Sequence, residues 1–205
     1  CARQKGSDQD RNNDLLGVET LHPLVSVIDL SKVDPINNMR LIFDFYVVFL
    51  KEDKNCDLLY GRQRYDYQKG SIVSLAPGQV IGTEDTGEKF QPKGWALCFH
   101  PDLIRGTTLG RNIKEYTFFS YEVNEALHLS EKERTIIIDC LEKIRYELQQ
   151  SIDRLSKRLI ATNIELLLDY CLRFYERQFI TRGNVNHDIL TRFERLLDDY
   201  FIGPK

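Results

Sequence analysis

The sequence predicts an α+β protein with a small antiparallel β-barrel or sandwich first, a helical pair next and a short C-terminal helix last. Three observations support this fold class. Short runs of β-branched and aromatic residues, separated by Gly and Pro, fill the chain before residue 125. Two consecutive stretches within residues 130–179 carry apolar residues every three or four positions. Strands and helices come in separate blocks, which argues against βαβ units.

Composition limits the class of protein. The 205 residues suffice for one domain, or for a domain with a fragment of another. The chain carries 28 Lys and Arg against 31 Asp and Glu, for a formal net charge of −3. A nucleic-acid-binding surface normally needs a basic face, so this balance argues against one within the chain. No apolar run approaches the roughly 20 residues of a membrane span, so we expect a cytoplasmic protein without membrane contact.

The five cysteines are widely spaced, odd in number and without a C-x-x-C pair; they are Cys1, Cys56, Cys98, Cys140 and Cys171. This usage is typical of reduced thiols in the cytoplasm. It predicts neither a disulfide framework nor a zinc site.

The β-rich part begins after residues 1–20, which are polar and predict a flexible N-terminal arm. Residues 24–30 form a first strand-like run, and residues 41–50 predict the strongest strand, with apolar residues on both faces. Residues 57–68 predict two short strands separated by a glycine. Residues 71–75 predict another short strand.

A tight turn follows at residues 76–79, because Pro77 presets φ at one central position and Gly78 tolerates positive φ at the next. Residues 94–99 predict a strand, and residues 103–115 a short helix and loop. Residues 116–121 (YTFFSY) predict a last β-like run.

The first long helix opens with a capping box, in which Ser130 caps the helix and Glu133 reaches back to it. After an expected break at residues 151–153, the second helix carries two apolar stripes. One consists of Ile160, Ile164, Leu167, Cys171 and Phe174; the other consists of Leu159, Leu166 and Tyr170, beside Leu155. A helix packed on its own domain needs one stripe. The second stripe indicates another contact surface, either a third layer of the same domain or another chain.

Residues 182–205 predict a linker around Gly183 and one more amphipathic helix, for which Asn186 is the expected cap.

Catalytic and metal-binding patterns are weak in this sequence. The four histidines lie in separate segments, and Cys98 with His100 could supply two ligands but no third. The same pair lacks an orienting third group for nucleophilic catalysis. No glycine pattern for phosphate binding is present. We therefore predict a protein that is not an enzyme, with no catalytic residue, metal or cofactor.

A small-molecule pocket is the remaining candidate site. Aromatic residues are dense in the β part, and apolar pockets with a few convergent polar groups commonly lie at barrel mouths. The candidate ligand-binding residues are Tyr46, Tyr60, Arg62, Arg64 and Trp95. The two arginines would hold an anionic or hydroxylated ligand. The alternative interpretation places the aromatic residues in the core and the arginines on the outer face of the sheet.

Several segments together resemble a known family. Residues 70–79 (GSIVSLAPGQ) resemble the glycine–proline turn of a cupin sensor domain, and residues 94–102 (GWALCFHPD) resemble the strand and corner that follow it. The helical pair resembles the helices that pack on the cupin and dimerise in AraC-type transcription regulators. Residues 188–200 (DILTRFERLLDDY) resemble the first helix of that family's DNA-binding domain. The resemblance covers roughly residues 21–200, in the style of regulators from Bacteroides-like bacteria.

The resemblance implies a domain plan: a flexible arm (1–20), a cupin-like sensor domain (21–125), a helical dimerisation element (126–181), and a linker with the first helix of a truncated DNA-binding domain (182–205). It implies a homodimer that senses an unknown small-molecule effector and contacts DNA only through a helix-turn-helix beyond this chain. The expected dimer seam lies at Leu159, Leu166 and Tyr170.

The sequence departs from metal-binding cupins, because it lacks their His-x-His plus Glu pattern. Two other interpretations stay open: a metal-free cupin enzyme such as an isomerase, and a non-catalytic interaction scaffold with a filled barrel.

Overall fold

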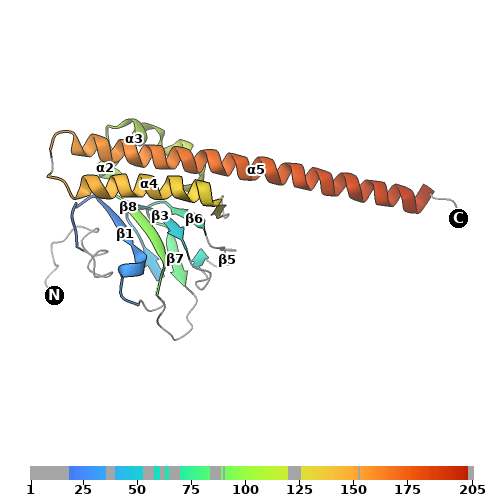
Figure 1. Cartoon of the computed structure of the whole chain (residues 1–205), viewed down its shortest axis with the longest axis horizontal. Helices are drawn as coiled ribbons and strands as arrows, with labels where there is room; N and C mark the ends of the chain where they lie inside the picture. The colour runs from blue at the N-terminus through green and yellow to red at the C-terminus, as the bar shows by residue number, and fades with distance from the viewer. Residues whose placement is uncertain are drawn as a thin grey trace.

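The computed structural model has two antiparallel sheets, one of which is covered by a pair of long helices (Figure 1). It describes residues 19–35, 40–52, 58–60, 63–64, 70–83, 89, 91–119, 126–151 and 153–202. For residues 40, 41, 58–60, 63, 64, 81, 83 and 180–202 the backbone alone is described.

The larger sheet has five strands in the order β1-β8-β3-β6-β9; they are β1 (Val25–Asp29), β8 (Gly94–Phe99), β3 (Tyr46–Lys51), β6 (Ser71–Leu75) and β9 (Leu127–His128). The smaller sheet has four in the order β2-β7-β4-β5; they are β2 (Arg40–Ile42), β7 (Val80–Thr83), β4 (Leu58–Tyr60) and β5 (Gln63–Arg64). Every pairing is antiparallel. The described strands of the two sheets do not pair with each other, so no closed barrel is formed.

Side-chain alternation gives the five-stranded sheet two apolar faces. On one face Val48, Leu50 and Leu97 pack against the helices. On the other, Val47 and Ala96 belong to a separate apolar cluster. The central strands are thus buried on both sides, and within the predicted strand at residues 41–50 this is confirmed for the part that lies in β3.

Two long helices cover the first of these faces. They are α4 (Glu131–Leu148) and α5 (Ser156–Ile202), and the predicted break between them is confirmed. Both helices contribute fully buried residues to the shared core, among them Ile137 and Ile144 from α4 and Ile164 from α5. The predicted buried stripe of α5 is confirmed for all its members.

Short helical elements fill the connections. They are η1 (Leu30–Lys32), α2 (Pro101–Ile104), α3 (Thr108–Asn112), η2 (Ile113–Glu115) and η3 (Thr117–Phe119). The predicted turn is confirmed, because the Gln79 N–H donates to the Ala76 carbonyl (3.2 Å) and Gly78 has φ 83°.

One predicted strand is wrong in its extent. Residues 41–50 form two strands, and the chain bends between them at Asp44 and Phe45. Asp44 is exposed, and aspartate is disfavoured in strands. The Phe43 carbonyl accepts from the Gly78 N–H (2.7 Å) instead of joining a ladder. The bend passes the chain from β2 in the smaller sheet to β3 in the larger one.

A second predicted strand, residues 116–121, is also wrong for residues 116–119, whereas residues 120 and 121 lie outside the described residues. The structure has the 3-10 turn η3 there, and the Phe119 N–H donates to the Tyr116 carbonyl (3.1 Å). Tyr116, Phe118 and Phe119 are all buried, a spacing that no single strand face provides. The strands β7 and β9 were not predicted, since both are short and carry little alternation.

The predicted linker around Gly183 is replaced by continuous helix, because α5 runs unbroken from Ser156 to Ile202. Its segment contains no proline and only one glycine, which costs a helix about 1 kcal/mol relative to alanine. Continuing the helix adds a hydrogen bond per residue, whereas a new helix at Asn186 would need a new nucleus. Figure 1 shows the C-terminal part of α5 projecting beyond α4 and the sheets.

The capping box at α4 yields a first prediction. The Ser130 N–H donates to Glu133 Oε2 (2.8 Å), and the Glu133 N–H donates to Ser130 Oγ (3.4 Å). We expect Ser130→Ala to lower the free energy of unfolding by about 1 kcal/mol, measured by urea denaturation. Ser130→Asp keeps an acceptor at the cap and should cost less. Equal losses in the two variants would contradict a role for the cap oxygen.

Candidate functional site

The structure does not bring Tyr46 and Trp95 together. Both lie on the helix-facing side of the five-stranded sheet, but Tyr46 begins β3 opposite Phe99, whereas Trp95 lies opposite Leu50. Four residues of strand separate these positions, which is about 13 Å. The two aromatic residues therefore lie at opposite ends of the sheet face that the helices cover.

Tyr46 packs as a core residue. Its ring stacks on Phe99 (5.1 Å between centroids) and meets Phe119 edge-on (4.9 Å). Partial burial raises the pKa of its hydroxyl above the usual value. These contacts match the alternative interpretation in which the aromatic residues belong to the core.

Trp95 faces helix α4. The guanidinium carbon of Arg145 lies 5.2 Å from the centre of the indole ring, within the range of a cation–π contact. Arg145 also pairs with Glu142 at 2.5 Å. Trp95 thus helps to fix α4 on the sheet.

Two of the other three candidate ligand residues lie in the smaller sheet, Tyr60 in β4 and Arg64 in β5. The pairing of Leu59 with Arg64 and of Tyr60 with Gln63 confirms two adjacent strands within residues 57–68, and Gly61 between them lies outside the described residues. Tyr60 and Arg64 are described by their backbone only, and Arg62 lies outside the described residues.

Cys98 and His100 have separate structural roles. Cys98 is buried in the cluster on the face away from the helices, whereas His100 Nδ1 accepts from the Asp102 N–H (3.1 Å) and caps α2. Burial raises the pKa of the Cys98 thiol to about 12, against a smaller opposing effect of the Ser26 hydroxyl. Within the described ranges, no three His, Cys, Asp or Glu side chains converge as metal ligands would.

The Cys98 environment yields a second prediction. At pH 8 a thiol with pKa about 12 is ionised on the order of 1,000-fold less than an unperturbed one. We expect iodoacetamide to modify Cys98 at least that much more slowly in the native protein than in urea, measured by peptide mass spectrometry. Comparable rates in the two states would contradict this burial.

The second stripe of α5 lies on the surface. Leu155, Leu159 and Leu166 are each 39% exposed, and we call these three residues the outer stripe. Leu159 and Leu166, seven residues apart, lie on one face of α5, and Leu155 immediately precedes the helix, where its carbonyl accepts from the Leu159 N–H (2.9 Å). Tyr170, half-buried beside them, stacks on Phe174 at 5.9 Å between centroids. No third layer among the described residues covers this face.

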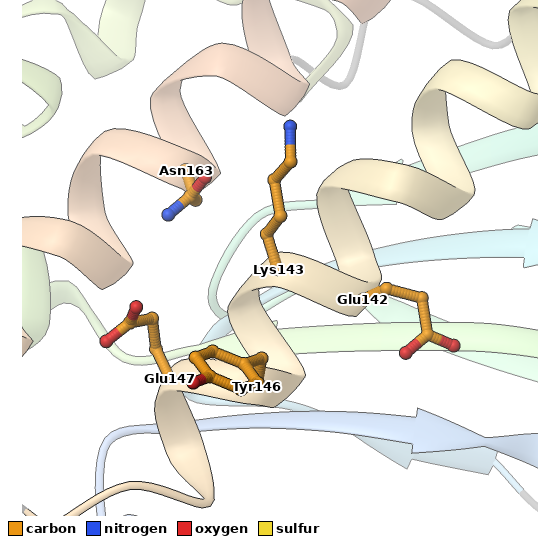
Figure 2. Close-up of a pocket in the computed structure, with 5 residues that line it drawn as sticks. All are labelled: Glu142, Lys143, Tyr146, Glu147 and Asn163. Atoms are coloured by element: carbon orange, nitrogen blue, oxygen red, sulfur yellow. The ribbon is translucent and has the colours of Figure 1, made fainter.

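An open groove of about 530 Å³ runs between α4 and α5 beside the outer stripe (Figure 2). It is lined by Glu142, Lys143, Tyr146, Glu147 and Asn163. Tyr146 is 61% exposed, and Asn163 donates to the Leu159 carbonyl (2.9 Å). These residues carry no signal in the sequence, because an outward-facing helix surface with mixed charges has no motif.

The groove combines both charge signs with an exposed aromatic ring and has no convergent catalytic set. This composition suits contact with another polypeptide surface better than chemistry on a substrate. No protein-family model and no curated protein sequence matches this chain. None of the described helices is both long and apolar enough to cross a bilayer.

Proposed function

We propose that this chain is the effector-sensing and dimerisation region of an AraC-type transcription regulator, acting as a cytoplasmic homodimer. The observation that carries the proposal is the outer stripe, with exposed Leu159 and Leu166 on α5 and exposed Leu155 just before it, on a helix whose opposite face is already buried in the protein's own core. Such a face gains free energy when a second apolar face covers it.

The arrangement of elements is compatible with signal transfer. In this proposal the two antiparallel sheets would act as the sensor part, and α5 leads from its packed end to a projecting end (Figure 1). A ligand that binds one arrangement of α4 and α5 better than another would shift their population. DNA would be contacted by a helix-turn-helix that follows the present residues.

The ligand-binding part of the proposal now depends mainly on Tyr60, Arg62 and Arg64. Tyr46 and Trp95 have packing partners that explain their positions. The test is a thermal-shift screen of the chain against sugars and small metabolites. A compound that raises Tm should lose most of its effect in Arg62→Ala and Arg64→Ala, and should keep it in Arg173→Ala, an exposed change on α5.

The regulator itself is tested on the full-length gene product. We expect it to protect a segment of its own upstream DNA in footprinting, and the effector to change that protection. A full-length product that binds no upstream fragment would overturn the proposal.

One observation favours a second candidate, the interaction scaffold with a filled barrel. Phe43 and Phe45 are buried with their ring centroids 5.0 Å apart, in the cluster on the face away from the helices. Aromatic rings in this place leave less room for a ligand. A thermal-shift screen without any hit would favour the scaffold.

A further inference from the structure

The edge strand β9 has its outer backbone groups bound by side chains of α5. On its inner side β9 pairs with β6, with His128 opposite Ser71. On its outer side the His128 N–H donates to Gln178 Oε1 (2.9 Å), and Gln178 Nε2 donates to the Ala126 carbonyl (3.1 Å). The Gln178 amide thus supplies one donor and one acceptor, as a neighbouring strand would. An edge strand otherwise leaves such groups unpaired.

A second side chain of α5 extends this contact. The Arg177 guanidinium donates to the His128 carbonyl (3.1 Å). Its Nε lies 2.9 Å from Glu133 Oε1, the carboxylate that also closes the capping box of α4. We call the contacts of Arg177 and Gln178 with residues 126–128 the β9–α5 clamp. It joins the sheet edge to both long helices.

The Gln178 side of the clamp is shielded from water, whereas the bond of Arg177 to the His128 carbonyl is exposed. Gln178 is 7% exposed, and its bond to Ala126 is buried. Removing one partner of a buried hydrogen bond leaves the other unsatisfied, which costs more than the bond itself contributes. The clamp therefore opens only if β9 and α5 find other partners.

The clamp also continues into the sheet. Ser71 Oγ lies 3.0 Å from His128 Nδ1, and Ser71 is fully buried. Ser71 faces Lys51 on its other side, so Lys51, Ser71 and His128 form one row across β3, β6 and β9. A change in this row acts directly on β9, the strand whose backbone Gln178 binds.

The clamp lies where α5 leaves the body of the protein. The helix continues from Gln178 to Ile202, about 36 Å at 1.5 Å per residue, and projects past the sheets (Figure 1). We infer that the β9–α5 clamp couples the edge of the five-stranded sheet to the projecting half of α5, so that loosening either one loosens the other. The inference depends on contacts within this chain and holds whether or not it is a transcription regulator.

Hydrogen exchange of the full chain, followed by mass spectrometry, tests this coupling. In Gln178→Ala we expect the amides of residues 126–129 and of residues 179–190 to exchange at least fivefold faster. Glu176→Ala, an equally helix-compatible change at an exposed position, should leave both segments within twofold of the parent protein. Unchanged exchange of residues 126–129 in Gln178→Ala would overturn the clamp.

The variant Ser71→Ala distinguishes coupling from a local defect, because Ser71 lies in β6, one strand away from the backbone groups that Gln178 binds. We expect it to accelerate exchange in residues 179–190 at least threefold. Faster exchange confined to β6 and β9 would overturn the coupling. Should Gln178→Ala fail to fold, Gln178→Glu keeps an acceptor for the His128 N–H but places a carboxylate oxygen, which cannot donate, against the Ala126 carbonyl. It should then accelerate exchange in both segments, and an unchanged pattern would overturn the inference.

Discussion

Gly94→Ala is expected to destabilise the protein by more than about 4 kcal/mol, a large part of the roughly 5–15 kcal/mol that keeps a domain folded. Gly94 begins β8 with φ 125°, a conformation that residues with a side chain rarely adopt. A Cβ at this position would lie 2.0 Å from the Leu50 carbonyl oxygen of β3. Because that oxygen belongs to the backbone of a central strand, β3 and β8 would have to separate. Urea denaturation followed by circular dichroism measures the loss.

Gly78→Ala is the matched control, because it measures the cost of a positive φ in a residue with a Cβ, without a steric clash. Gly78 also has positive φ, 83°, but no atom lies within 4 Å of the position its Cβ would take. The left-handed conformation alone costs roughly 1–2 kcal/mol. A loss of similar size in both variants would show that β3 and β8 have room for the added methyl group.

The contrast between these two glycines shows what the sequence can predict about the fold. The Pro77-Gly78 turn is local, so neighbouring residues were enough to predict it, and the same holds for the Ser130 capping box. The close approach at Gly94 depends on which strand lies beside β8. Nothing near Gly94 in the sequence encodes β3 as its neighbour.

The wrong predictions have a similar origin. Whether residues 41–50 form one strand or two depends on the pairing of β2 with β7, which is invisible to a pattern of alternating residues. The Gly183 region was read as a linker from its weak helix formers, but α5 continues through it. In both places the outcome depends on distant partners or on helix cooperativity, and local propensity gives only a weak indication.

In the candidate site, too, local patterns could be predicted and contacts between distant segments could not. Helical period was sufficient to predict an apolar face on α5 beyond the buried one, and that face is exposed at Leu159 and Leu166. The clamp at Gln178 could not be predicted, because a single glutamine in a helix has no pattern. Its partner β9 is only two residues long. Tyr46 and Trp95 were grouped by residue type, whereas the strand register places them at opposite ends of one face.

Leu166→Glu is expected to raise the dissociation constant of the proposed dimer at least 100-fold, so that dimers dissociate into monomers. A leucine that is 39% exposed in one copy can be covered by the outer stripe of a second copy. Two glutamates brought together there would have to lose their hydration without gaining partners of opposite charge. Sedimentation should show the average mass falling toward the 24.0 kDa of one chain.

Arg158→Gln is the matched control, because it changes the net charge by the same single unit on the same helix. Eight residues at about 100° each place Arg158 about 80° around α5 from Leu166, off the outer stripe. It should leave both the assembly state and the free energy of unfolding close to those of the parent chain. If Leu166→Glu remains dimeric while Lys143→Glu in the adjoining groove does not, the seam lies over α4 and not along α5. If the parent chain is itself a monomer at high concentration, the outer stripe does not serve self-association, and the homodimer must be abandoned with it.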